Sequence, residues 1–316
     1  MSEINSSENR FNNLNALLGV MLMSLREYWT QAENYQKFVY IISALLIASG
    51  VFHMGTFLLA DEPWAGPVSW RKPIVFGFSF GITNLILAWI MTFLPRHRVS
   101  SWLLMGTLGI ASLVEVLLIT MQKWRGVPSH FNNETPFDQA VFGGMGIMIA
   151  FVGLVIVVLM LWSFFSLKTT PSMAWAIRVG LILLVFGQVF GILLIVNGVQ
   201  TTNYATASIF SEPGQLKVPH AVSLHALQLL PVLAWLLLFT NWPESRRTKA
   251  VVLAAAGYMG LVAVSSLQTF SGLSHIDLNL LTTLLLGISV IGISSAYIAA
   301  IRALRQTLLL TGSQAA

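Results

Sequence analysis

The stretch AVFGGMGIMIAFVGLVIVVLMLWSFF, residues 140–165, contains no charged side chain. A helix needs about 20 consecutive apolar residues to cross the hydrocarbon core of a bilayer, and this stretch is longer than that. Seven further apolar runs of similar length carry few charges and lie at residues 38–60, 73–94, 101–121, 175–197, 219–240, 250–271 and 279–302. The sequence therefore predicts an all-α, polytopic membrane helical bundle with about eight transmembrane helices.

The composition of the whole chain agrees with this class. Of 316 residues, 56% are hydrophobic and 9% are charged, and the mean hydropathy is +0.76. We expect an N-terminal cytoplasmic or interfacial segment at 1–36, an eight-helix transmembrane domain at 37–305 and a cytoplasmic tail at 306–316. The run ALLGVMLMSL at 16–25 is too short to span a bilayer and is typical of a helix that lies in the membrane surface.

Lys and Arg residues divide unequally between the two sides of the predicted bundle. Twelve lie on the side of the termini: Arg10, Arg26, Lys37, Arg96, Arg98, Lys168, Arg178, Arg246, Arg247, Lys249, Arg302 and Arg305. Five lie on the other side: Arg71, Lys72, Lys123, Arg125 and Lys217. The positive-inside rule places both termini in the cytoplasm. Topology and contact with the lipid bilayer thus explain the net charge of +5, which gives no support to nucleic-acid binding. The absence of Cys excludes disulfides, thiolate ligands, Fe–S clusters and covalently attached haem.

Three ionisable residues on different predicted helices lie at one depth. His53, Glu115 and His225 are each about 9 to 10 Å below the outer surface, on a rise of about 1.5 Å per residue. An unpaired charge there costs at least a few kcal/mol, so we expect Glu115 to face the bundle interior, neutral or paired. Ser112 and Gln122 share its helical face. We predict that His53, Glu115 and His225 converge on one cavity that opens to the periplasm or exterior.

Further polar residues lie near the predicted mouth of this cavity. His130 and His220 are expected to line it, and Gln228 lies on the same helical face as His225. Three outer cations flank it in the stretches SWRKP (69–73) and QKWRG (122–126), namely Arg71, Lys72 and Arg125. They either anchor helix ends at the interface or hold an anionic group over the mouth, such as a haem propionate, a carboxylate or a lipid phosphate.

The loop KWRGVPSHFNNETPFDQ at 123–139 separates two spans. Its apolar residues Trp124, Phe131 and Phe137 predict that the loop is ordered and packs on the bundle. Asp138 is expected to cap the following helix. The strings RGVPSHFNNETPFD (125–138) and PHAVSLHALQLLP (219–231) resemble the two signature stretches of an uncharacterised family of multi-pass bacterial membrane proteins. The resemblance covers most of the helical region and implies a bacterial inner-membrane protein, but it implies no activity.

Three classes of function fit these residues. In the favoured class, His53, Glu115 and His225, with His220 and His130, bind haem b or a transition metal (Fe, Cu or Zn) for redox chemistry, and Glu115 acts in catalysis. Such a protein would exchange electrons with a quinone or a periplasmic redox partner. In the second class, a proton-coupled transporter of a small anionic or amphipathic solute uses Glu115 as its proton carrier. In the third, the buried polar groups stabilise a scaffold or sensor.

Overall fold

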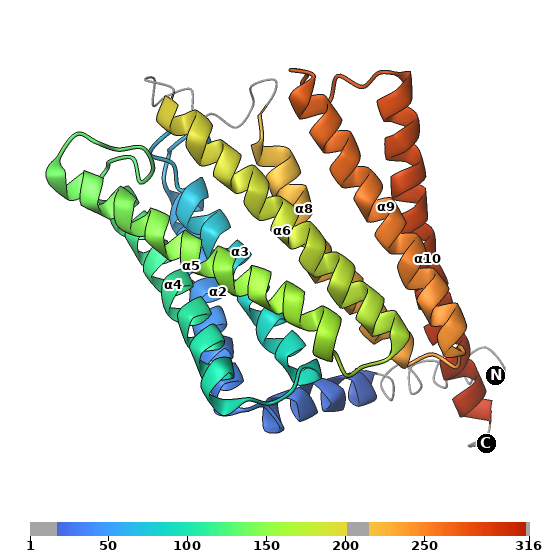
Figure 1. The fold of residues 1–316 in the computed structure, drawn as a ribbon. Helices are drawn as coiled ribbons and strands as arrows, with labels where there is room; N and C mark the ends of the chain where they lie inside the picture. The colour runs from blue at the N-terminus through green and yellow to red at the C-terminus, as the bar shows by residue number, and fades with distance from the viewer. Residues whose placement is uncertain (1–17, 201–214, 314–316) are drawn as a thin grey trace.

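The computed structural model describes residues 18–200 and 215–313, and all the regular structure in these ranges is helical (Figure 1). In chain order the labelled helices are α2 (Asn34–Leu59), α3 (Arg71–Ile90), η1 (Met91–Phe93), α4 (Arg98–Trp124), α5 (Pro136–Ser166), α6 (Pro171–Gln200), α8 (Lys217–Leu238), α9 (Glu244–Phe270) and α10 (Leu280–Ser313). Eight spans in this part of the chain are long and apolar enough to cross a membrane. The predicted class and the eight predicted spans are confirmed.

Several helices run further than their apolar cores. Helix α4 reaches Trp124, three residues beyond the predicted end, and α5 already begins at Pro136. An apolar run marks only the length of helix that lies within the hydrocarbon core, whereas the residue at which the helix ends is set by capping. Pro136 occupies the first turn of α5, where its missing N–H has no helical partner to lose.

The spans form two groups that meet along the middle of the molecule (Figure 1). In the first group α3 packs against α2 and α4, and α4 packs against α5. In the second α6 packs against α8, and α9 contacts α6, α8 and α10. The groups are joined where α5 meets α6 and where α3 meets α8. The contact between α3 and α8 brings the polar residues of the two groups together.

Glycines allow close helix contacts in each group. A Cβ on Gly77 of α3 would lie 2.9 Å from the carbonyl oxygen of Leu46 on α2. A Cβ on Gly187 of α6 would lie 2.8 Å from the Leu224 side chain on α8. Small residues at such crossings let helix backbones approach in the absence of a hydrophobic driving force.

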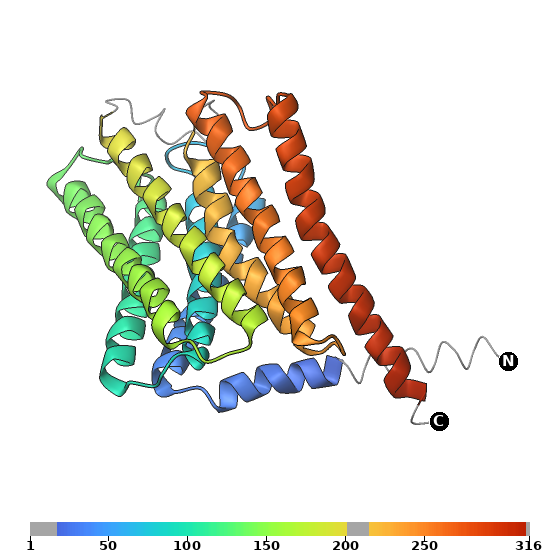
Figure 2. The same cartoon turned by 45° about the vertical axis from the view of Figure 1, so that its right-hand side comes forward.

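A further helix at 18–30 lies across one end of the bundle, on the side where α10 ends (Figure 2). The sequence predicts a short surface helix here, and the structure confirms a helix; residues 16 and 17 of the predicted run lie outside the described residues. Its apolar side chains Leu22 and Met23 are 64% and 61% exposed. An exposed apolar surface of this kind is typical of a helix embedded in a membrane interface.

Candidate functional site

Glu115 is buried inside the first group of helices, as its helical face predicts. Its side chain is 3% exposed, and Ser112 and Gln122 on the same face of α4 are fully buried. Its carboxyl oxygen Oε2 has no hydrogen-bond partner among the described residues. No Lys, Arg or His there forms an ion pair with it. Since an unpaired charge is expensive in a low-dielectric interior, this environment favours the neutral, protonated carboxyl.

One helical turn away, Ser112 connects α4 to α3. Its hydroxyl donates to the Asn84 side-chain oxygen at 3.3 Å. Asn84 is fully buried, and its amide nitrogen has no partner in the described part of the chain. Asn84 is the single amide side chain of the predicted span 73–94, so a search for lone polar residues in apolar runs would have found it.

The layer of polar residues continues from α3 to α8. Thr83, next to Asn84 in the sequence, accepts a long hydrogen bond of 3.5 Å from the Gln228 amide. Gln228 in turn accepts a 2.7 Å hydrogen bond from Nδ1 of His225. Gln228 and His225 thus share one face of α8, as predicted, while His225 itself is exposed. We call Glu115, Ser112, Asn84, Thr83, Gln228 and His225 the mid-bundle polar layer.

His53 does not belong to this layer. Its Nε2 accepts from the Trp124 indole N–H at 3.2 Å, and its Nδ1 lies 2.7 Å from the Ser49 carbonyl. Because indole can only donate and a carbonyl can only accept, the ring is neutral with its proton on Nδ1. Both ring nitrogens are therefore occupied, and neither is available to a metal. The ring also stacks on Trp70 at 5.9 Å.

The two outer tryptophan-and-cation stretches meet beside His53. The Lys123 ammonium lies 4.3 Å from the centre of the Trp70 ring. It donates to Glu62 at 2.5 Å and to the Val68 carbonyl at 3.2 Å. The hydrogen bond from Lys123 lowers the pKa of Glu62. These contacts anchor the loop between α2 and α3 to the end of α4.

The predicted metal site is not supported. His53, Glu115 and His225 lie six, nine and eight residues from the outer ends of their helices, or about 9, 14 and 12 Å deep. The three residues thus lie at different depths, and His53 bonds to Ser49 and Trp124, apart from the mid-bundle polar layer that contains Glu115 and His225. Over residues 18–200 and 215–313 no three His, Asp or Glu side chains are placed to hold a metal ion. The described residues likewise give no support to the prediction that His130 and His220 bind a metal.

Asp138 and Arg125 pair with each other below the outer loop. Arg125 donates to Asp138 at 2.7 Å, and Gln122 donates to the same oxygen at 2.9 Å. The helix cap is Thr135, whose hydroxyl accepts from the Asp138 backbone N–H at 3.1 Å and donates to its carboxylate at 2.6 Å. The prediction that Asp138 caps α5 was therefore wrong by one turn. Arg125 forms this ion pair, and its predicted role in anion binding stays a prediction.

His130 packs within aromatic rings where the outer loop meets α3 and α5. The centres of the Phe76 and Phe142 rings lie 5.6 and 6.4 Å from that of His130. Burial and then the cations Lys72, Arg71 and Lys217 lower the pKa of His130 to about 3. These contacts confirm the prediction that the loop is ordered and packs on the bundle. His220, predicted beside it, instead directs Nδ1 to the Gly187 carbonyl of α6 at 2.7 Å.

Three cations therefore gather near His130 at the outer ends of two helices. Arg71 and Lys72 begin α3, and Lys217 begins α8. Lys72 forms no ion pair with any residue that the structure describes. The sequence predicts a cluster of Arg71 and Lys72 with Arg125. Lys217, which the sequence places only on the same side of the bundle, joins Arg71 and Lys72 because α3 packs on α8.

No family model, curated protein or solved structure matches the chain. The resemblance to a bacterial membrane-protein family, the bacterial inner membrane as location and the predicted domain bounds stay predictions.

Proposed function

We propose that the protein is a proton-coupled transporter of a small anion, with Glu115 as the proton carrier. The observation that carries this proposal is the isolation of the Glu115 carboxyl: it is 3% exposed and lacks any cationic partner in the described residues. Ionisable groups inside a membrane domain are costly and mark proton or substrate pathways. A carboxyl that is neutral at rest can release its proton only when its surroundings change, which is the property required for coupling.

The mid-bundle polar layer supplies such surroundings. Ser112 is buried one turn from Glu115 and bonds to the buried Asn84 of α3. Hydroxyl and amide groups can hydrogen-bond to either protonation state of a carboxyl. The layer crosses from α4 through α3 to α8, and so it spans the contact between the two groups of helices. A change in how the groups meet would alter the polarity around Glu115.

The outer cations favour an anion as the transported solute. Arg71 and Lys72 at the start of α3 and Lys217 at the start of α8 lie at the positive ends of two helix dipoles. A cation is electrostatically unfavourable beside the positive end of a helix dipole. A bound carboxylate or phosphate would offset that cost. Lys72, which has no ion-pair partner among the described residues, is the residue that we assign to solute binding.

Proteoliposomes test this function. Purified protein is reconstituted with an internal pH dye, and a proton gradient is imposed in the presence of succinate, citrate or inorganic phosphate. We expect proton flux that depends on one of these anions and falls at least tenfold in Glu115→Gln. Glu134→Gln, the same change on an exposed loop residue, is the control and should behave as the unaltered protein. Lys72→Gln should raise the KM for the anion with a smaller change in kcat. Wild-type flux in Glu115→Gln, or no anion-dependent flux for any of the three solutes, would contradict the proposal.

A further inference from the structure

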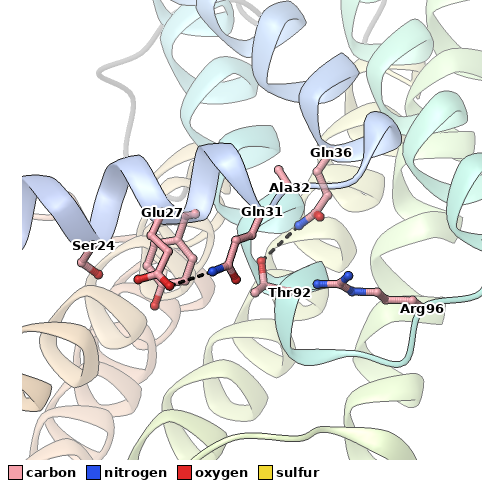
Figure 3. A pocket seen from close by; sticks show the side chains of 8 residues that line it. Ser24, Glu27, Gln31, Ala32, Gln36, Thr92 and Arg96 are labelled. Atoms are coloured by element: carbon pink, nitrogen blue, oxygen red, sulfur yellow. Dashed lines mark hydrogen bonds between the residues drawn. The ribbon is translucent and has the colours of Figure 1, made fainter.

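A pocket of about 230 Å³ lies at the opposite end of the bundle from the outer cations, between helix 18–30 and the end of α3 (Figure 3). Its lining comes from two directions. Glu27, Tyr28 and Gln31 belong to helix 18–30 and the residue after it, while Thr92 and Arg96 belong to η1 and the following loop. Polar atoms make up most of what these residues present to it.

The side chains around the pocket retain unused hydrogen-bonding groups. Glu27 accepts from the Gln31 amide through Oε1 at 2.7 Å, and Oε2 has no partner among the described residues. Arg96 donates one N–H of Nη1 to Glu33 at 2.9 Å, which leaves most of its five donors free. Figure 3 shows Glu27 and Gln31 on one side of the pocket and Thr92 and Arg96 on the other. A negative and a positive group therefore face the same small space.

The position of the pocket points to the membrane surface. Helix 18–30 exposes Leu22 and Met23, as a helix does when it lies in an interface. The pocket is smaller than the roughly 300 to 1,000 Å³ typical of sites for whole drug-sized ligands, and so it suits a compact polar group. Tyr28 adds a phenol hydroxyl to the lining, which is neutral at physiological pH and can donate.

We infer that this pocket binds a zwitterionic group that carries an ammonium and a phosphate, as found in the ethanolamine headgroup of a phospholipid. Glu27 would accept from the ammonium, and Arg96 would donate to the phosphate. This site is independent of the proposed transport function, because it lies at the other end of the bundle and contains none of the same residues. A bound headgroup would link helix 18–30 to the loop between α3 and α4.

Binding of three soluble probes to the full-length protein in detergent tests the inference. The probes are dihexanoyl phosphatidylethanolamine, which has both charges and short chains, dihexanoyl phosphatidylglycerol, which lacks the ammonium, and O-phosphoethanolamine, which lacks the chains. We expect the ethanolamine lipid to bind at least tenfold more tightly than the glycerol lipid. Equal binding of O-phosphoethanolamine and the ethanolamine lipid would identify a soluble zwitterion as the ligand, and much weaker binding of the former would identify a lipid.

Two substitutions separate the charges. Glu27→Gln should remove the preference for the ethanolamine lipid and leave binding of the glycerol lipid unchanged, which also shows that the variant is folded. Arg96→Gln should weaken both lipids about tenfold, and Arg96→Lys should restore part of that loss. Arg98→Gln, a change of the same kind two residues along the same surface, is the control. The inference is overturned if neither zwitterionic probe binds more tightly than the glycerol lipid, or if Glu27→Gln keeps the preference.

Discussion

His130 shows how the charge of one side chain depends on three elements. The imidazole lies in the loop between α4 and α5, against Phe76 of α3 and Phe142 of α5. Burial and the nearby cations Lys72, Arg71 and Lys217 lower its pKa to about 3. In an opened loop the ordinary pKa of His would be near 6.5. The packed loop therefore binds fewer protons than the opened loop between these two values, and its stability falls as the pH falls below about 6.5.

We predict that lowering the pH from 7 to 5 increases opening of the 125–135 loop about 25-fold, or about 2 kcal/mol, because the opened form gains a proton that the packed form does not. Hydrogen exchange of this segment, corrected for the intrinsic pH dependence of exchange, measures the effect. His130→Gln should remove most of it, whereas His97→Gln, an exposed residue at the other end of the bundle, should not. Equal pH dependence in His130→Gln would show that another group is responsible.

The sequence predicted the environment of Glu115 better than that of His53. Glu115 shares a helical face with Ser112 and Gln122, and the cost of burying a charge restricts that face to the interior. No comparable pattern surrounds His53, whose partners Trp70 and Trp124 approach from a loop and another helix. Depth along a helix can be counted from sequence, but rotation and neighbour order depend on packing between distant segments.

The start of α5 is held by two reciprocal hydrogen bonds between neighbouring residues. Thr135 accepts from the backbone N–H of Asp138 and donates to its carboxylate, and Pro136 fills the first turn. The sequence Thr-Pro-Phe-Asp contains this signal, yet the nearest acid was assigned as the cap. Asp138 instead uses its buried carboxylate to bind Gln122 of α4 and Arg125, the residue that follows α4. These bonds join the first turn of α5 to the end of α4.

Replacing Thr135 by Ala should free this turn. We expect a loss of roughly 1 to 2 kcal/mol in local stability, because both hydrogen bonds between Thr135 and Asp138 are removed. Hydrogen exchange at residues 136–140 should accelerate accordingly, while Thr135→Ser retains protection. Thr56→Ala, which removes an exposed hydroxyl bonded within α2, is the control. Unchanged protection in Thr135→Ala would mean that Asp138 holds the turn through Gln122 and Arg125 alone.

The whole molecule separates its charges by side. The ends of the helices gather at two opposite faces (Figures 1 and 2). Of the twelve cations counted on the side of the termini, all but Arg10 belong to the described residues. The eight spans could be predicted from hydropathy because a helix that crosses the bilayer must be long and apolar. The two-sided charge pattern follows because each span carries the chain to the opposite side. The assignment of each face to a compartment rests on the positive-inside rule.

Cysteine labelling in intact cells tests that orientation, and the chain is suited to it because it contains no Cys. We predict that Asn133→Cys, in the loop before α5, reacts with a membrane-impermeant maleimide, and that Ser245→Cys, at the start of α9, reacts only after the cells are permeabilised. Both positions are exposed, so a difference reports the side of the membrane rather than burial. The predicted result places the outer cations toward the exterior and the pocket of Glu27 and Arg96 toward the cytoplasm. The reverse result would place the cations that we assign to solute binding on the cytoplasmic face, and the proposed transporter would then take up its anion from inside the cell.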